Sequence, residues 1–195
     1  LDLIDKVIGK APGASTYAAM NIILMPESMV AIADTHVNAN PNAQELADIA
    51  IMAAQEMRHL RIEPKLAFVS SSNFGTDVPC SGSVIREALA LVREREPDLE
   101  IDGEMHCDAA LDEKLRARIM PDSPLKGAAN VLICPNVEAG NIAYNLLKVS
   151  AGSNVAVGPF LLGMNAPITI LTSSSTVRRI VNMAALTVVD ANIRK

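Results

Sequence analysis

The chain has 195 residues, half of them hydrophobic, and a formal net charge of −5 at pH 7. No apolar segment approaches the uncharged stretch of about 18 residues that a membrane span needs, and no basic stripe with interleaved aromatic residues offsets the acidic balance, which argues against a nucleic-acid surface. The three cysteines (Cys80, Cys107 and Cys134) form no C-x-x-C pair and indicate reduced thiols in a cytoplasmic protein rather than a disulfide framework.

In the first half of the chain, apolar runs of strand length alternate with runs of helical periodicity. Apolar residues recur at helical spacing from Leu46 to Met57, so a helix there is predicted to bury one face. The elements expected in this half are strands at Asn21–Met25, Met29–Ala33 and Lys65–Val69, a helix that follows Asn42, and a helix from Ser83 to about Arg95.

The second half of the chain continues the alternation. Its expected elements are strands at Val131–Cys134, Val155–Leu162 and Ile168–Leu171, and helices at Ala139–Val149 and Thr176–Val189. Strands that alternate with helices indicate an α/β fold, in which crossover helices join the strands of a mostly parallel sheet.

A polar segment, SSSNFG at Ser70–Gly75, lies between a predicted strand and a predicted helix. This is the carboxyl edge of the sheet, where open α/β proteins bind ligands, and Ser and Gly allow backbone N–H groups to approach an anion. Ser72, Asn73 and Gly75 are therefore candidate ligand-binding residues. An ordinary polar loop is the alternative.

Glu104, His106 and Asp108 alternate along the chain. A strand through them would place all three side chains on one face, where they are candidates for ligand binding. A polar sheet edge facing a cleft is the expected interpretation, and a metal site is the weaker alternative. His59 is expected only to complement the negative end of its helix.

The last loop, Thr172–Thr176, has five consecutive hydroxyl side chains directly before a predicted helix. Arg178 and Arg179 follow in the first turn, where each cation costs roughly 0.3–1 kcal/mol unless an anion compensates it. Exposed N–H groups and two guanidinium groups make this loop a candidate anion site. A salt bridge to a neighbouring Asp or Glu is an equally open alternative.

Several long motifs stand in the order of one known family. They are ADTHVNANP at Ala33–Pro41, SSSNFG at Ser70–Gly75, DGEMHCDAAL at Asp102–Leu111, SPLKGAANVLICPNVEAGNIAYNLL at Ser123–Leu147 and GPFLLGMNAPITILTSSSTVRRIVNMAALT at Gly158–Thr187. Together they resemble the phosphate acetyl/butyryl transferases over nearly the whole chain. The nearest resemblance is to the phosphotransacetylase-like C-terminal region of hybrid bacterial NADP-dependent malic enzymes.

The resemblance implies a three-layer αβα fold of the phosphotransacetylase and isocitrate-dehydrogenase type, truncated on its N-terminal side. Residues 1–150 would form the second αβα domain, and residues 151–195 would return to a first domain whose upstream part is absent. Leu1 is not an initiator Met, and no signal peptide follows it, in agreement with a cut through a longer chain. A bare apolar sheet face would favour a homo-oligomer.

Within the family's GNI-x-Y motif, Asn141 and Tyr144 would face the ligand, whereas Gly140 has the alternative role of permitting close helix–sheet packing. The family pattern E-x-Q-x-D at Glu104–Asp108 carries a histidine in place of the glutamine here, and it implies no metal.

The family's last loop carries a serine–arginine pair, followed six positions after the arginine by an acidic residue. Aligned on Pro167 and Ile180, these positions are Thr172, Ser173 and Arg179 here. Arginine stays protonated and cannot act as general base on the thiol of CoA, and a serine cannot replace a bidentate arginine. The resemblance therefore implies a site without catalytic residues at these positions.

The leading hypothesis is an acyl-CoA-responsive regulatory and oligomerisation domain with acetyl-CoA as effector and no cofactor of its own. NADP and a divalent metal would belong to the malic-enzyme part, which converts malate to pyruvate and CO2. One alternative is an active phosphate acetyltransferase that uses Asp108, Glu104 or His106 as base. Another is a scaffold without ligand.

Overall fold

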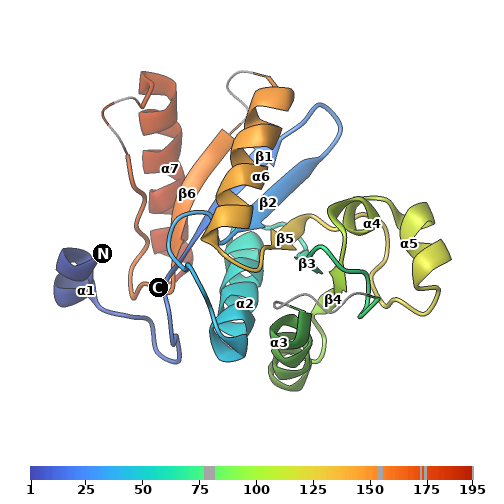
Figure 1. The fold of residues 1–195 in the computed structure, drawn as a ribbon. Helices are drawn as coiled ribbons and strands as arrows, with labels where there is room; N and C mark the ends of the chain where they lie inside the picture. Colours follow the sequence, from blue (N-terminus) through green and yellow to red (C-terminus); the bar gives the residue numbers. More distant parts are fainter. Residues whose placement is uncertain (77–81, 153–155, 172, 174, 195) are drawn as a thin grey trace.

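The computed structural model describes residues 1–76, 82–152, 156–171, 173 and 175–194. Strands and helices alternate along most of this range (Figure 1). The strands are β1 (Ala18–Leu24), β2 (Met29–Ala33), β3 (Lys65–Val69), β4 (Glu100–Met105), β5 (Val131–Ile133) and β6 (Ala156–Leu162). The helices are α1 (Asp2–Ile8), α2 (Ala43–His59), α3 (Gly82–Arg95), α4 (Cys107–Leu111), α5 (Glu113–Ile119), α6 (Val137–Ser150) and α7 (Val177–Ile193).

The six described strands form one sheet in the order β4-β3-β5-β2-β1-β6. Strands β4, β3, β5 and β2 run parallel to one another, whereas β1 pairs antiparallel with both β2 and β6. The predicted α/β fold with a mostly parallel sheet is confirmed. Strand β6 extends the same sheet beyond β1, although it belongs to the segment that was expected to return to another domain; the boundary at residue 150 stays a prediction.

Helices cover both faces of the sheet, which makes the fold three-layered (Figure 1). Alternate residues of β3 point to opposite faces of the sheet. Leu66 and Phe68 belong to the core that α2 and α3 cover. Ala67 and Val69 belong to the core that α4 and α6 cover. Met183 of α7 belongs to the first of these cores. Most buried aliphatic residues therefore lie in two apolar layers on either side of the sheet.

Side-chain caps fix where several helices begin. Asn42 accepts a hydrogen bond from the N–H of Glu45, and the Glu45 carboxylate accepts one from the N–H of Asn42, so α2 begins with a capping box. The side chain of Asn136 caps α6 in the same way as that of Thr176 caps α7. These caps lie within three residues of the predicted helix starts.

Two predicted strands are wrong. Ile168–Leu171 forms no strand, because only Thr169 pairs, in an isolated bridge with Phe160, and Pro167 lacks the N–H that a ladder requires. The strand expected through Glu104, His106 and Asp108 ends at Met105, and His106 is the N-terminal flanking residue of α4. None of the described helices has the length and apolar character that crossing a membrane requires.

Candidate functional site

The loops that follow β2, β3, β4 and β5 lie at one edge of the sheet, because these four strands are parallel and end there. This is the edge at which open α/β sheets bind ligands. Two groups of polar side chains lie along this edge of the sheet. One surrounds Glu104, and the other lines a cavity between the loop after β2, α6, β6 and α7.

The first group joins the loop after β3 to the end of β4. The carboxylate of Glu104 is fully buried, and its Oε1 and Oε2 lie 2.8 and 3.0 Å from Nη1 of Arg86, while the N–H of Gly75 donates to Oε1 at 3.1 Å. Asn73 accepts a hydrogen bond from the N–H of His106 at 2.8 Å. The structure thus brings together Asn73, Gly75, Glu104 and His106, which the sequence analysis proposed separately as candidate ligand-binding residues.

The structure does not place Glu104, His106 and Asp108 on one strand face, as a strand through all three would have done. Asp108 lies in the first turn of α4, where its Oδ1 accepts a hydrogen bond from the N–H of Ala109, so it does not share a strand face with Glu104. Ser72 is buried, whereas His106 and Asp108 are exposed. The buried carboxylate of Glu104, held by Arg86 and Gly75, links the loop after β3 to the end of β4 and to α3.

The second group encloses a cavity of about 330 Å³. Its polar lining comes from His36, Tyr144, Asn145, Lys148 and Arg179. The Nζ of Lys148 lies 5.7 Å from the centroid of the Tyr144 ring, and the rings of His36 and Tyr144 are 6.5 Å apart. Among the described residues that line this cavity, none is a carboxylate, so its charged groups are cations.

The loop after β2 forms one wall of the cavity. Oδ1 of the buried Asp34 accepts hydrogen bonds from the N–H groups of Ala19, His36 and Val37, and Oδ2 accepts one from the N–H of Asn38. These bonds fix the backbone of the loop and with it the position of His36 at the cavity.

Helix α6 contacts this loop closely at Gly140. A Cβ on Gly140 would lie 2.0 Å from the carbonyl O of Asp34, which leaves no space for any side chain. Next to it, the Asn141 amide donates to the carbonyl O of Thr35 at 3.1 Å. The structure supports the close-packing role that the sequence left open for Gly140, and it gives Asn141 a bond to the loop.

Arg179 brings the first turn of α7 to the cavity. Its Nη2 donates to the carbonyl O of Gly158 at 2.7 Å, and its buried Nε has no partner among the described residues. No described carboxylate forms a salt bridge with it. The salt bridge that was the alternative is thus not found for Arg179 among the described residues, and its binding of an anion stays a prediction.

The charge of Arg179 also affects the ionisable groups of the cavity. Burial lowers the pKa of His36; the Asp34 carboxylate opposes this shift, and Arg179 adds to it. Burial raises the pKa of Tyr144, and Arg179 acts against that rise. At neutral pH the cavity therefore presents a neutral imidazole, a neutral phenol and two cations.

The other residues predicted in the last loop are not part of the described cavity lining. Arg178 and Ser173 are exposed, and neither lines the cavity. Thr172 lies outside the described residues. Of the two arginines, the structure places only Arg179 in the site.

Sequence reasoning missed His36, Asn145, Lys148 and the Arg86 partner of Glu104. Lys148 and Asn145 follow Tyr144 and Asn141 at helical spacing, so the periodicity of α6 contained a signal for them. Arg86 had no comparable signal, because its contact with Glu104 joins residues from two different elements.

Residues 2–188 match the family model described as phosphate acetyl/butaryl transferase. The chain belongs to this family. It is 54% identical over 189 residues to the NADP-dependent malic enzyme of Salmonella typhimurium, and 43% identical over 189 residues to the phosphate acetyltransferase of Paracoccus denitrificans. The alignments cover 97% and 93% of this chain, but 25% and 59% of those relatives.

Solved structures agree with the family's fold. The EutD phosphotransacetylase from Staphylococcus aureus superposes with a TM-score of 0.90 at 30% sequence identity. The match covers 96% of this chain and 58% of that protein. The family's three-layer α/β fold is thus present, and the chain spans about a quarter of the malic enzyme to which it is similar.

Proposed function

We propose that this chain is the phosphotransacetylase-like part of an NADP-dependent malic enzyme, and that its cavity binds an acyl-CoA without transferring the acyl group. The observation that supports this proposal is the charge of the cavity, which Lys148 and Arg179 line without a carboxylate among its described residues. Such a lining favours the phosphates of acetyl-CoA and lacks the acidic base that the family resemblance assigns to the position of Arg179.

The rest of the longer protein would convert malate to pyruvate and CO2 with NADP and a divalent metal. The concentration of acetyl-CoA would reflect the supply of material to the pathway downstream of pyruvate. Acetyl-CoA is therefore a suitable effector for the reaction that produces pyruvate. Regulation requires that acetyl-CoA bind two states of the enzyme with different affinity. The cavity between α6, β6 and α7 gives such a difference a structural basis, because its walls come from separate elements.

Calorimetric titration of acetyl-CoA into the full-length protein tests this proposal. We expect Arg179→Gln to weaken binding at least about tenfold, which corresponds to about 1.4 kcal/mol, because it removes a cation from the cavity. Arg178→Gln is the matched control, since this neighbouring arginine is exposed and does not line the cavity. No binding by the parent, or equal losses in both variants, would contradict the proposal.

An active phosphate acetyltransferase is the second candidate function, and His36 is the observation that favours it. Its lowered pKa leaves a neutral imidazole in the cavity, where it is able to accept a proton. The bases considered from the sequence (Glu104, His106 and Asp108) do not line this cavity. Formation of acetyl-CoA from acetyl phosphate and CoA at about 10 turnovers per second or more, lost in His36→Gln, would favour this function over the regulatory one.

We also propose that the protein acts in the cytoplasm as a homo-oligomer. Ile142, Leu146 and Val149 form an exposed apolar stripe along α6, and a second copy of the chain would cover it.

A further inference from the structure

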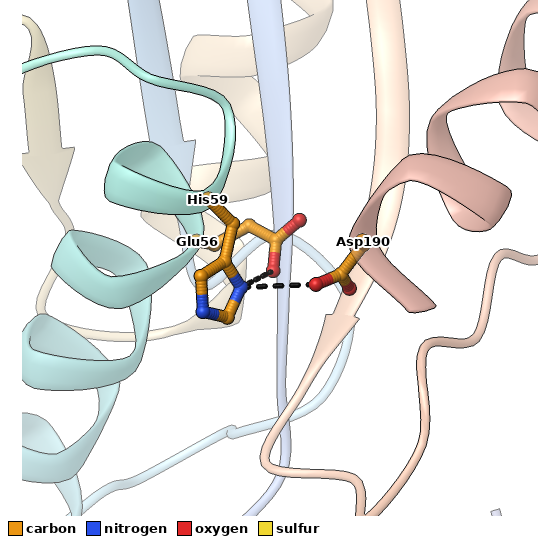
Figure 2. A group of neighbouring side chains, drawn as sticks. All are labelled: Glu56, His59 and Asp190. Atoms are coloured by element: carbon orange, nitrogen blue, oxygen red, sulfur yellow. Dashed lines mark ion pairs between the residues drawn. The ribbon is translucent and has the colours of Figure 1, made fainter. Parts of the chain in front are cut away.

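A second cavity, of about 180 Å³, lies on the side of the sheet covered by α2, between that helix, Arg194 and the segment around Gly163. Glu56 and His59, from the last turn of α2, line it, and Asp190 of α7 joins them (Figure 2). One donor atom from each of the three side chains lies within 4.8 Å of the other two. Neither the acyl-CoA proposal nor the sequence prediction for His59 gives this cluster a role.

Both carboxylates approach the Nδ1 atom of His59, and they lie on the same side of the imidazole ring (Figure 2). Nδ1 lies 2.9 Å from Oδ1 of Asp190 and 3.8 Å from Oε2 of Glu56. Despite these ion-pair distances, Nδ1 makes no hydrogen bond with any described residue. Two carboxylate oxygens thus lie near a ring nitrogen that hydrogen-bonds to neither of them.

Glu56 supplies a second, independent observation. Its side chain is only 3% exposed, and its Oε1 has no hydrogen-bond partner among the described residues. A buried oxygen without a partner is destabilising, and more so when the group is charged. The same carboxylate faces the His59 imidazole with its other oxygen, Oε2, and a cation bound by this carboxylate would supply the partner that Oε1 lacks.

Arg194 does not balance the cluster by itself. Its Nε donates to Oδ1 of Asp190 at 2.7 Å and its Nη2 to Oε2 of Glu56 at 3.2 Å, so one positive charge faces two carboxylates. Asp48, in the same cavity, already pairs with Arg95 at 2.6 Å. Because a carboxylate has about four lone-pair positions, Glu56 and Asp190 are each able to hold Arg194 and a metal ion together.

We propose that Glu56, His59 and Asp190 form a binding site for a first-row divalent transition-metal ion such as Zn²⁺. One imidazole nitrogen and two carboxylate oxygens suit Zn²⁺, whereas Ca²⁺ and Mg²⁺ take oxygen ligands. Three protein ligands leave a fourth position, which the neighbouring cavity has room to fill with water. The ion would link the C-terminal end of α2 to the last turns of α7.

Zinc stoichiometry of the full-length protein tests this site. After dialysis against a chelator, the parent and His59→Ala are titrated with Zn²⁺ by calorimetry, and bound zinc is counted per chain. We expect His59→Ala to bind one equivalent less than the parent, a difference that is independent of metal sites elsewhere in the protein. His59 is 26% exposed, so the variant is expected to fold.

Asp48→Asn is the matched control, because it removes a buried carboxylate of α2 from the same cavity without removing a ligand. It should keep the equivalent that His59→Ala loses. Replacement of zinc by Co²⁺ adds a spectroscopic test: the visible absorption of the bound ion should be present in the parent and Asp48→Asn and weaker by one site in His59→Ala. Equal stoichiometry or equal Co²⁺ absorption in the parent and His59→Ala would overturn the proposal.

Discussion

At the residue scale, Gly140 shows how the family's GNI-x-Y motif serves packing and site together. A Cβ at this position would meet the carbonyl O of Asp34 at 2.0 Å, and this backbone atom belongs to the loop that positions His36. We expect Gly140→Ala to lower the free energy of unfolding by about 1–3 kcal/mol, because the overlap forces α6 away from the loop. Urea denaturation of the two proteins measures the difference.

Gly82→Ala at the start of α3 is the control for that substitution. Its Cβ would meet the ends of two side chains, Oε1 of Glu104 at 3.0 Å and Nη1 of Arg86 at 3.2 Å, rather than a backbone atom. Side-chain ends shift more easily, so the loss should be smaller. A loss as large as that of Gly140→Ala would show that the contact with Asp34 is not what requires glycine.

At the element scale, two arginines of α3 allow a comparison of ion pairs with two buried carboxylates, of which only one has a second side-chain partner. Arg86 holds both oxygens of Glu104, which is fully buried, whereas Arg93 contacts one oxygen of Asp102, whose other oxygen accepts a hydrogen bond from Ser123. Both arginine side chains are 49% exposed. We expect Arg86→Ala to cost about 2 kcal/mol in unfolding free energy and Arg93→Ala about 1 kcal/mol or less.

Thermal or urea denaturation of the two single variants checks this order. Arg86→Ala should also loosen the loop after β3, because Gly75 bonds to the same Glu104 oxygen, and faster amide hydrogen exchange in that loop would show it. The prediction is wrong if Arg93→Ala is the more destabilising of the two.

The contact between α2 and α7 predicts a pH dependence in the metal-free protein. The pKa of Glu56 is raised from 4.5 to about 7. Burial is the largest cause and repulsion by Asp190 is the second, while Arg194 opposes the rise. Between these two values the unfolded chain has released the proton that the folded chain keeps. The contribution of Glu56 to the free energy of unfolding should therefore be greatest below about pH 4.5. It should fall by about 3 kcal/mol as the pH rises to about 7.

Urea denaturation in chelator-containing buffers between about pH 5 and about pH 8 measures this fall. Glu56→Gln should flatten the profile relative to the parent, since the amide does not titrate. Glu87→Gln, at an exposed position of α3, should leave the profile unchanged. Parallel profiles for the parent and Glu56→Gln would refute the assignment to Glu56.

The elements that the sequence predicted well are those that carry local signals. Lys65–Val69 is apolar and of strand length, Asn42 caps a helix with clear periodicity, and both are found as expected. Ile168–Leu171 has the composition of a strand but pairs with β6 only through an isolated bridge at Thr169, and only the tertiary structure decides this. The approach of Asp190 to His59 joins residues 131 positions apart, and no local pattern predicts it.

At the scale of the whole molecule, α7 connects the two proposed sites. Arg179 in its first turn faces the acyl-CoA cavity, and Asp190 near its end faces the metal cluster, with Met183 buried against the sheet between them. A change in how α7 packs would therefore affect both sites. The helix is consequently the element through which ligand binding and metal binding would influence each other.

The apolar stripe of α6 leads to the last prediction, which concerns assembly. Ile142, Leu146 and Val149 recur at helical spacing and are 68%, 66% and 81% exposed, so each copy of the chain presents an apolar stripe that a second copy would cover. We expect light scattering at micromolar concentration to show a dimer or larger species for the full-length protein.

Val149→Glu should shift the assembly toward the monomer, because the charge would be buried in the contact. Ile119→Glu, on α5 and 38% exposed, is the control and should leave the mass unchanged. A parent that is strictly monomeric, or an equal response to both variants, would show that the stripe of α6 does not join two copies.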